Sequence, residues 1–213
     1  MVNRLRLLLV GIGGLIVIAI YTFPLWQPVL LREAVVEDVP GLPEDLQPAF
    51  RQLPADQQAA YRQMAEQNAD MAAQMLQAAV SPDNPVPEAE QEMPQMTNEV
   101  VIAEGEFQSE DQLRQVAGKY LLYELPDNRR VLRLEEFRIT NGPDLHVVQS
   151  RSANPKTGTE VGSDYIDLGL LQGNVGSQNY SVPAEVDLEA YQSIVIFNVS
   201  FATVFGSAPM VVQ

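Results

Sequence analysis

The side chains that could carry chemistry in this chain are few. The 213 residues contain no cysteine, which excludes disulfides, thiolate nucleophiles, iron–sulfur clusters and haem attachment through a CxxCH motif. His146 is the only histidine, and together with Met210 it could ligate a haem iron. The alternative is a structural role, because His146 stands at a position predicted to lie in a strand. A Ser-His-Asp triad would also need His146, but the chain has no G-x-S-x-G elbow.

Oxygen donors gather near the predicted turns of the C-terminal half, and hard cations such as calcium prefer oxygen ligands. These donors are Asn141, Asp144, Asp164, Asp167, Asn174 and Asn179. The carboxylates Asp144, Asp164 and Asp167 are the candidate calcium ligands. No EF-hand spacing is present, and Asp144 and Asp167 have an alternative role as turn residues that hydrogen-bond to their own backbone. We therefore expect no bound cofactor, with calcium and haem as the alternatives.

Two further patterns have both a functional and a structural interpretation. The glycines of GNVGSQN, residues 173–179, could surround a phosphate, but their simpler use is in turns that require positive φ. Methionines at positions 64, 71, 75, 93 and 96 could bind copper through their thioethers. Copper-binding methionines cluster more tightly than these, so we expect the methionines to pack against the downstream domain or against a partner helix.

The elements that would position these side chains are predicted to be strands. From about residue 99 onward, short apolar runs alternate with Gly, Pro, Asn and Asp, a pattern typical of an all-β domain. The predicted strands cover residues 100–107, 118–125, 131–140, 144–150, 165–172, 193–200 and 204–212. Residues 151–164 and 173–180 are predicted loops. This series of short strands indicates an antiparallel sandwich or barrel.

One predicted strand changes phase along its length. Its apolar residues are Leu132, Leu134, Phe137 and Ile139. In a regular strand the first two would face one side and the last two the other side, because successive side chains alternate. A β-bulge near Glu135 and Glu136 would place all four in the core.

Several motifs of this half resemble the DM13 domain family. They are an L-x-x-F strand, an N-G-P-D-L turn, a D-L-G-x-L-x-G-N-x-G-x-Q-N-Y run and an F-G-x-A motif near the C-terminal end. The resemblance covers roughly residues 100–210. The residues that carry it are Asn141, Gly142, Pro143, Asp144, Asp167, Gly169, Gly173, Asn174, Gly176, Asn179 and Tyr180.

The resemblance implies an extracellular or membrane-associated domain. DM13 domains often stand beside DOMON and cytochrome b561-type domains, and the electron-transfer role proposed for the family relies on a cysteine in a late strand. Asn198 occupies that position here, so thiol chemistry is absent from this chain. Asn198 alternates with Ile194 and Ile196, and on a buried face its amide would have to be hydrogen-bonded.

The formal net charge of the chain is −15. Binding to nucleic acid depends on lysines and arginines that neutralise phosphates, so this charge argues against a nucleic-acid partner. It also disfavours flat docking of the protein on an anionic lipid surface.

The N-terminal region predicts a membrane anchor. Residues 7–26 carry no charge and match the ~20 residues that a bilayer-spanning helix needs. Arg4 and Arg6 precede this run, and aromatic residues gather at its end. The positive-inside rule then leaves residues 1–6 in the cytoplasm and everything after the anchor outside. The alternative is a cleaved signal peptide, but such a peptide has an apolar core of roughly 7–15 residues and an A-x-A-like site, which this segment lacks.

Residues 27–98 are predicted to form an acidic, proline-rich stalk between the anchor and a β domain at 99–213. Within it, residues 56–80 have apolar side chains spaced three, four and seven apart, which predicts one amphipathic helix capped by Asp56. The stretch SPDNPVPEAEQEMPQM, residues 81–96, has no periodicity and is predicted to be a linker.

Together these patterns predict a single-pass protein of the cell membrane that displays its β domain outside the cytoplasm. We expect this domain to be a non-catalytic binding or interaction module, with the membrane and another envelope protein as partners. The alternative is an accessory electron-transfer domain of the cell envelope, which the resemblance suggests and the missing cysteine weakens. A hydrolase would need an acid/base pair, and no motif for one is present, so we do not expect an enzyme.

Overall fold

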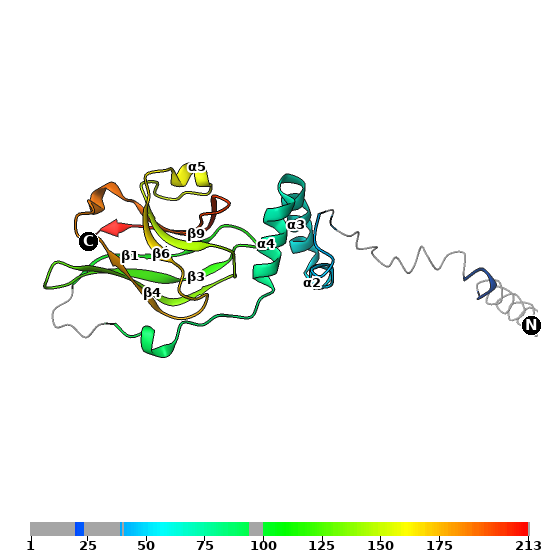
Figure 1. Ribbon diagram of the computed structural model, residues 1–213, viewed down its shortest axis with the longest axis horizontal. Coiled ribbons are helices and arrows are strands. Elements are labelled where there is room, and N and C mark those ends of the chain that lie inside the picture. Colours follow the sequence, from blue (N-terminus) through cyan, green and yellow to red (C-terminus); the bar gives the residue numbers. More distant parts are fainter. Residues whose placement is uncertain (1–19, 24–38, 40, 94–99, 213) are drawn as a thin grey trace, which may run out of the picture. The chain divides into compact units, whose positions relative to one another are not determined.

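The computed structural model describes residues 20–23, 39, 41–93 and 100–212. The chain forms two compact units, residues 1–38 and residues 39–213, and the labelled elements of Figure 1 belong to the second unit. Of the predicted anchor at 7–26, only residues 20–23 are described, and they are helical; the rest lies outside the described residues. No helix in the described part of the chain is long and apolar enough to cross a membrane.

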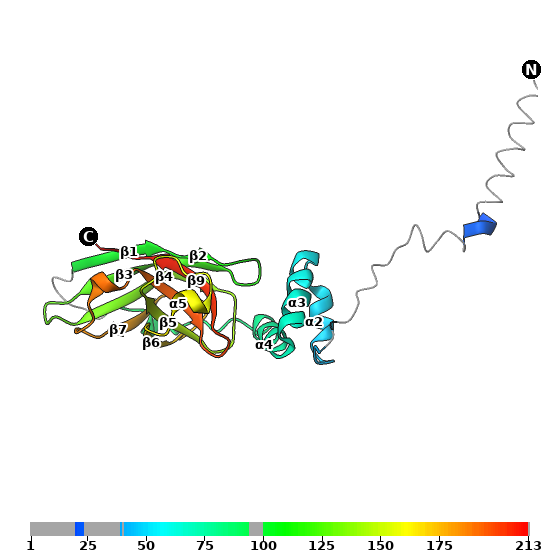
Figure 2. The same ribbon diagram turned by 90° about the horizontal axis from the view of Figure 1, so that it is seen from above.

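Two antiparallel sheets of five strands each build the C-terminal half and lie in two layers (Figures 1 and 2). The strand order is β10-β1-β3-β4-β7 in the first sheet and β2-β9-β8-β5-β6 in the second. The strands are β1 (Val100–Glu106), β2 (Gln108–Ser109), β3 (Val116–Glu124), β4 (Arg130–Ile139), β5 (Leu145–Ser150), β6 (Ile166–Leu170), β7 (Gln178–Val182), β8 (Ser193–Asn198), β9 (Thr203–Pro209) and β10 (Val211–Val212). The antiparallel all-β prediction is confirmed, whereas the barrel alternative is wrong because the sheets do not close.

The predicted bulge in β4 is present. Lys119 pairs with Glu135 and Ala117 pairs with Arg138, so the register shifts by one residue between them. Glu136 takes a φ of 50° in this bulge. The bulge reverses the phase of the strand, and the four apolar residues Leu132, Leu134, Phe137 and Ile139 are all buried.

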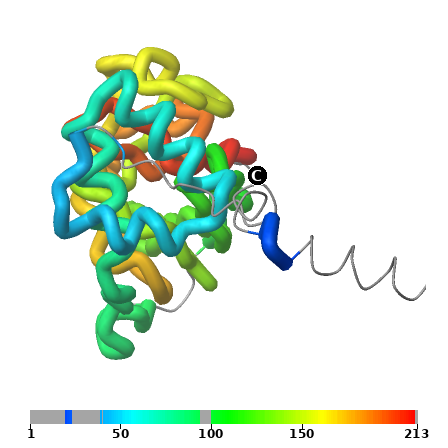
Figure 3. Tube along the Cα trace, turned by 90° about the vertical axis from the view of Figure 1, so that its right-hand side faces the viewer, coloured from blue at the N-terminus to red at the C-terminus, as the bar shows by residue number. Residues whose placement is uncertain are grey.

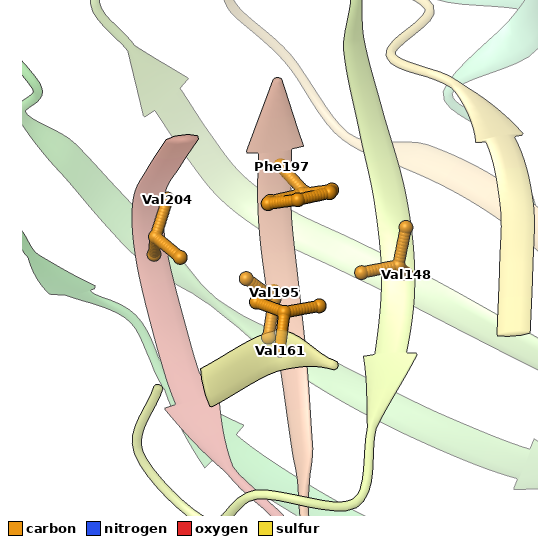
Figure 4. Close-up of a cluster of buried hydrophobic side chains, with 5 residues drawn as sticks. All are labelled: Val148, Val161, Val195, Phe197 and Val204. Carbon is orange, nitrogen blue, oxygen red and sulfur yellow. The ribbon is translucent and has the colours of Figure 1, made fainter. Parts of the chain in front are cut away.

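A small apolar cluster covers the outer face of the second sheet (Figure 4). Its members are Val148, Val161, Val195, Phe197 and Val204. Val161 comes from the short helix α5 (Gly158–Val161), which lies within the predicted polar loop 151–164. This loop therefore contributes one apolar side chain that shields the middle of the sheet from water.

Strand β7 lies partly in a segment predicted to be a glycine-rich turn, residues 173–180, so that prediction is wrong for its last residues. Gln178 pairs with Leu134 and Tyr180 pairs with Leu132 at the edge of the first sheet. Both Gln178 and Tyr180 are buried, because the strand presents alternate side chains to the core.

The single helix predicted over 56–80 is also wrong, because the structure has two helices in its place. They are α3 (Ala55–Gln67) and α4 (Ala69–Ala79), and α2 (Gln47–Gln52) precedes them (Figure 3). Asn68 separates α3 from α4 with an extended backbone, and its Oδ1 accepts a hydrogen bond from Met71 N at 3.0 Å. The buried residues of the three helices include Phe50, Tyr61, Met75 and Leu76. Met75 is therefore buried within this unit, whereas Met96 lies outside the described residues.

The described chain that follows α4 lies against the β-sheets. Residues 81–92, which we call the strap, include the short 3-10 helix η1 (Glu88–Glu90) and run below the sheets in Figure 1. Pro85 forms a parallel bridge with Val175, and Val86 N donates a hydrogen bond to Val175 O at 2.8 Å. Only 2% of Val86 is exposed. The structure therefore differs from the predicted linker throughout residues 81–92.

Candidate functional site

His146 lies on β5 with a carboxylate at each of its ring nitrogens. Its Nδ1 is 2.8 Å from Asp167 Oδ2, and its Nε2 is 3.3 Å from Asp144 Oδ1. The hydroxyl of Ser200 donates a hydrogen bond to Asp144 Oδ2 at 2.5 Å. Two of the three predicted calcium ligands therefore come together, with the imidazole between them.

This arrangement has a structural use. The Ser200 hydroxyl, and to a smaller extent His146, lower the pKa of Asp144 against the opposing effect of desolvation. Asp144 O also accepts a hydrogen bond from Val199 N at 3.2 Å. The hydroxyl proton of Ser200 points to a carboxylate and not to His146, which is unlike the nucleophile and base of a hydrolase. The cluster fastens the turn after β8 to the start of β5.

The other two predicted ligands lie elsewhere. Asp164 pairs with Arg151 Nε at 2.7 Å, beyond the end of β5 that is farther from His146. Met210 N donates to Gln192 O, next to the start of β8, whereas His146 pairs with Phe197 near the end of β8. At about 3.3 Å per residue, this separation is roughly 13 Å or more along the strand. The structure does not bring His146 and Met210 together, and no group of three His, Asp or Glu residues in the described ranges could hold a metal ion.

Asn198 is fully buried at the end of β8. Its Nδ2 donates a hydrogen bond to Pro143 O, and its Oδ1 accepts one from Phe201 N at 2.6 Å. The expectation that a buried Asn198 would be hydrogen-bonded is confirmed. The amide joins the turn after β8 to the turn before β5, at a position where the resemblance implies a thiol.

Five of the motif residues face the strap. Asn174 is at the centre: its Oδ1 accepts from Asn84 N at 2.7 Å, and its Nδ2 donates to Asp83 Oδ1 at 2.7 Å. Asn174 N also donates to Asn84 O at 3.1 Å. At Gly173, a Cβ atom would lie 2.5 Å from Asn84 O. The strap can approach this closely only because residue 173 has no side chain.

Contacts continue on both sides of Asn174. Toward the start of the strap, Asn141 Nδ2 lies 3.2 Å from Ser81 O and 3.3 Å from Pro82 O. Toward its end, Asn179 Nδ2 donates to Glu92 O at 3.1 Å. Gly176 has a φ of 109°, so it confirms the predicted use of glycine in a turn, and the side chain of Gln91 lies against it.

Two arginines complete this surface. Arg133 Nη1 donates to Gln91 O at 2.7 Å, and Arg138 Nη1 lies 3.2 Å from Asp83 Oδ2. A hollow of about 390 Å³ adjoins the start of the strap, and its lining includes Asp83, Arg138 and Asn141. We call the surface made by Arg133, Arg138, Asn141, Gly173, Asn174, Gly176 and Asn179 the strap groove.

The remaining motif residues serve the fold. Tyr180 donates its hydroxyl proton to buried Gln178 at 2.7 Å, and burial raises the pKa of this phenol. A Cβ atom at Gly142 would meet the ring of Phe205. Gly169 N donates to Asp167 Oδ1 at 2.8 Å, which agrees with the alternative role of Asp167 as a turn residue.

A family model described as "Electron transfer DM13" matches residues 106–210. This half of the chain is a DM13 domain. Comparisons with curated proteins and with solved structures give no match. The strap lies outside the matched range, yet residues inside the DM13 domain hold it.

Sequence reasoning missed the strap and the two arginines that contact it. The strap has no periodic pattern, and its partners lie about 90 residues away in the DM13 domain, as the bonds between Asn84 and Asn174 show. The one signal was the density of asparagine and glycine in residues 173–179. That run supplies more amide donors and acceptors than a turn needs for itself.

Proposed function

We propose that this chain is a membrane-anchored protein that displays its DM13 domain outside the cytoplasm as a binding module. The observation that supports this function is the strap groove. Residues that carry the DM13 resemblance hold the strap, which pairs with the domain at Pro85 and then forms the short helix η1, mainly through its backbone. A surface that already holds one polypeptide segment has the chemistry to hold another.

The proposed anchor is the charge-free run at residues 7–26. Its test is membrane fractionation of cells that express the full chain or a chain without residues 1–38. We expect the full chain to stay with the membranes after a carbonate wash and the shortened chain to be released. Recovery of the full chain in the wash would contradict the anchor.

Electron transfer is the second candidate, and the family description favours it. The side chains of this domain give it little support. The chain has no thiol, and Asn198 uses both ends of its amide for hydrogen bonds. His146 has carboxylates at both ring nitrogens, so a metal at Nε2 would have to displace Asp144.

A spectrum and a redox titration separate the two functions. The full chain is purified in detergent from a host supplied with iron, copper and haem, and its visible absorption, metal content and reduction behaviour are measured. A binding module is expected to be colourless, with iron and copper far below one atom per chain. A stoichiometric chromophore or metal with a reversible potential would overturn this proposal in favour of electron transfer.

A further inference from the structure

We propose that the strap groove recognises extended acidic segments of partner proteins, and that the strap is a ligand of the same class bound in cis. This inference rests on the proposed binding function and names its site and its ligand. The ligand pattern is an aspartate followed three positions later by an aliphatic residue, as in Asp83 and Val86.

Contacts to the backbone of the ligand contribute affinity that does not depend on the sequence of the ligand. The groove contacts the carbonyl oxygens of residues 81, 82, 84, 91 and 92 and the N–H groups of residues 84 and 86. These contacts are made to the main chain and are independent of the side chains that it carries, and η1 separates the contacts at residues 81–86 from those at residues 91 and 92. In strand-addition complexes, main-chain hydrogen bonds likewise give affinity while side-chain pockets give specificity.

Two side chains of the strap, Val86 and Asp83, account for the sequence specificity of the binding. Val86 is buried against the domain, and burial of a valine contributes about 1.5–3 kcal/mol. Asp83 accepts a hydrogen bond from Asn174 and pairs with Arg138. The hydrogen bond from Asn174 lowers the pKa of Asp83, so the groove favours the charged carboxylate. The two prolines on either side of Val86 favour the extended backbone before binding.

A ligand tethered to its own site competes strongly with one in solution. For a ligand joined to its site within one chain, the effective concentration is on the order of millimolar. The groove is therefore closed to a partner segment unless that segment binds more tightly or the strap is released. The strap therefore sets the binding affinity that a partner segment must exceed.

The test uses a fluorescein-labelled peptide of residues 81–92, SPDNPVPEAEQE, and fluorescence anisotropy with the full chain in detergent. Val86→Asp places a charge in the apolar site and releases the strap. We expect the peptide to bind this variant at least tenfold more tightly than the wild-type chain. A peptide with asparagine at the position of Asp83 and aspartate at that of Val86 is the matched control and is expected not to bind.

Two further variants show where the peptide binds. Gly173→Ala in the Val86→Asp background blocks the close approach to the groove, and we expect binding to be lost. Arg129→Ala in the same background removes an arginine that pairs with Asp127, outside the groove, and is expected to leave binding unchanged. Circular dichroism checks that each variant is folded, and Val86→Ala replaces Val86→Asp if the latter is not.

A disulfide provides the converse test, because the chain has no other cysteine. Pro85 and Val175 are bridge partners, and residues paired in this way lie at a separation that a disulfide can span. In a chain with Pro85→Cys and Val175→Cys, we expect oxidation to abolish peptide binding and reduction to restore the wild-type level.

Absence of peptide binding to a folded strap-released variant would overturn this inference. Equal binding of the control peptide, or binding that survives both Gly173→Ala and the disulfide, would also overturn it. None of these results bears on the presence of a redox centre, so failure here is distinguishable from failure of the proposed binding function.

Discussion

Gln149 and Gln178 are both fully buried in the DM13 domain, yet their amides have opposite surroundings. Gln178 donates to Gly173 O at 3.0 Å and accepts from Gln172 N and from the hydroxyl of Tyr180. Neither end of the Gln149 amide has a hydrogen-bond partner in the part of the chain that the structure describes. A buried polar group without a partner costs about 1–3 kcal/mol.

We therefore expect Gln149→Met to raise the free energy of unfolding by about 1–2 kcal/mol, because methionine has a similar shape and no polar group to desolvate. Gln178→Met is the matched control at equal burial and is expected to lower it by about 2 kcal/mol. Urea denaturation followed by far-ultraviolet circular dichroism measures the free energy of unfolding of both variants. A loss of stability in Gln149→Met would show that its amide is satisfied in solution.

Asn198 gives a second prediction at this scale. Asn198→Asp keeps the acceptor for Phe201 N but replaces the donor to Pro143 O with a second oxygen. We expect a loss of stability of about 2 kcal/mol or more at neutral pH, since a charge is also buried. Thermal unfolding checks this, with Asn128→Asp, in an exposed turn, as the control. Unchanged stability would mean that the amide is not needed.

At the scale of elements, the break between α3 and α4 rests on one residue. The apolar spacing of residues 56–80 runs through Asn68, so periodicity alone favours one helix. Asparagine is a strong N-cap, however, because its side chain can accept from the free N–H groups of the first turn. The sequence contained this signal, but an N-cap inside a periodic run competes with continuation of the helix, and tertiary packing decides between them.

Asn68→Ala removes the cap of α4, which accepts from Met71 N. We expect it to destabilise the unit formed by residues 39–213 by about 0.5–2 kcal/mol. Asn68→Asp keeps an acceptor at the same place and is expected to be nearly neutral. Denaturant midpoints of the two variants decide the matter, and equal loss in both would assign the break to packing instead.

The strap responds to pH through Asp83. Its folded-state pKa lies below the usual range because Asn174 donates to the carboxylate. The contribution of Asp83 to strap binding is therefore complete above the usual aspartate pKa of about 4 and is lost as the pH falls through the lower folded value. We expect the amide resonance of Val86 to move toward its unbound position in this range. In Asp83→Asn this acid-dependent movement should be smaller; an identical titration would point to another group.

At the scale of the whole molecule, local patterns in the sequence predicted much of the sandwich and little of the site. The bulge at Glu136 was predictable because a change of phase is visible within one strand. The start of β7 at residues 178–180 was hidden by the glycines before it. The strap groove depends on pairs such as Asn84 and Asn174, whose separation in sequence leaves no local signature. The cluster of His146 with Asp144 and Asp167 likewise required the pairing of β5 with β6.

The folding unit is predicted to be longer than the family match. A chain of residues 100–213 would lose the strap and expose the apolar site that Val86 covers. A chain of residues 81–213 would keep the strap, and this site would stay covered. We expect the shorter chain to melt at a clearly lower temperature, by at least several degrees for a loss of 1–2 kcal/mol. Calorimetry of the two chains makes the comparison. Equal melting temperatures would show that the strap adds no stability.

The order of the strap contacts has a mechanical consequence. Along the strap, the partners include Asn141, then Asn174, then Val175, and finally Asn179, in the order of the sequence. Arg138 and Arg133 add contacts at residues 83 and 91. A pull that lifts the strap from its α4 end would load these bonds one at a time. The attachment would then open in small steps at low force, while a pull along the strap would load all of them together and meet far greater resistance.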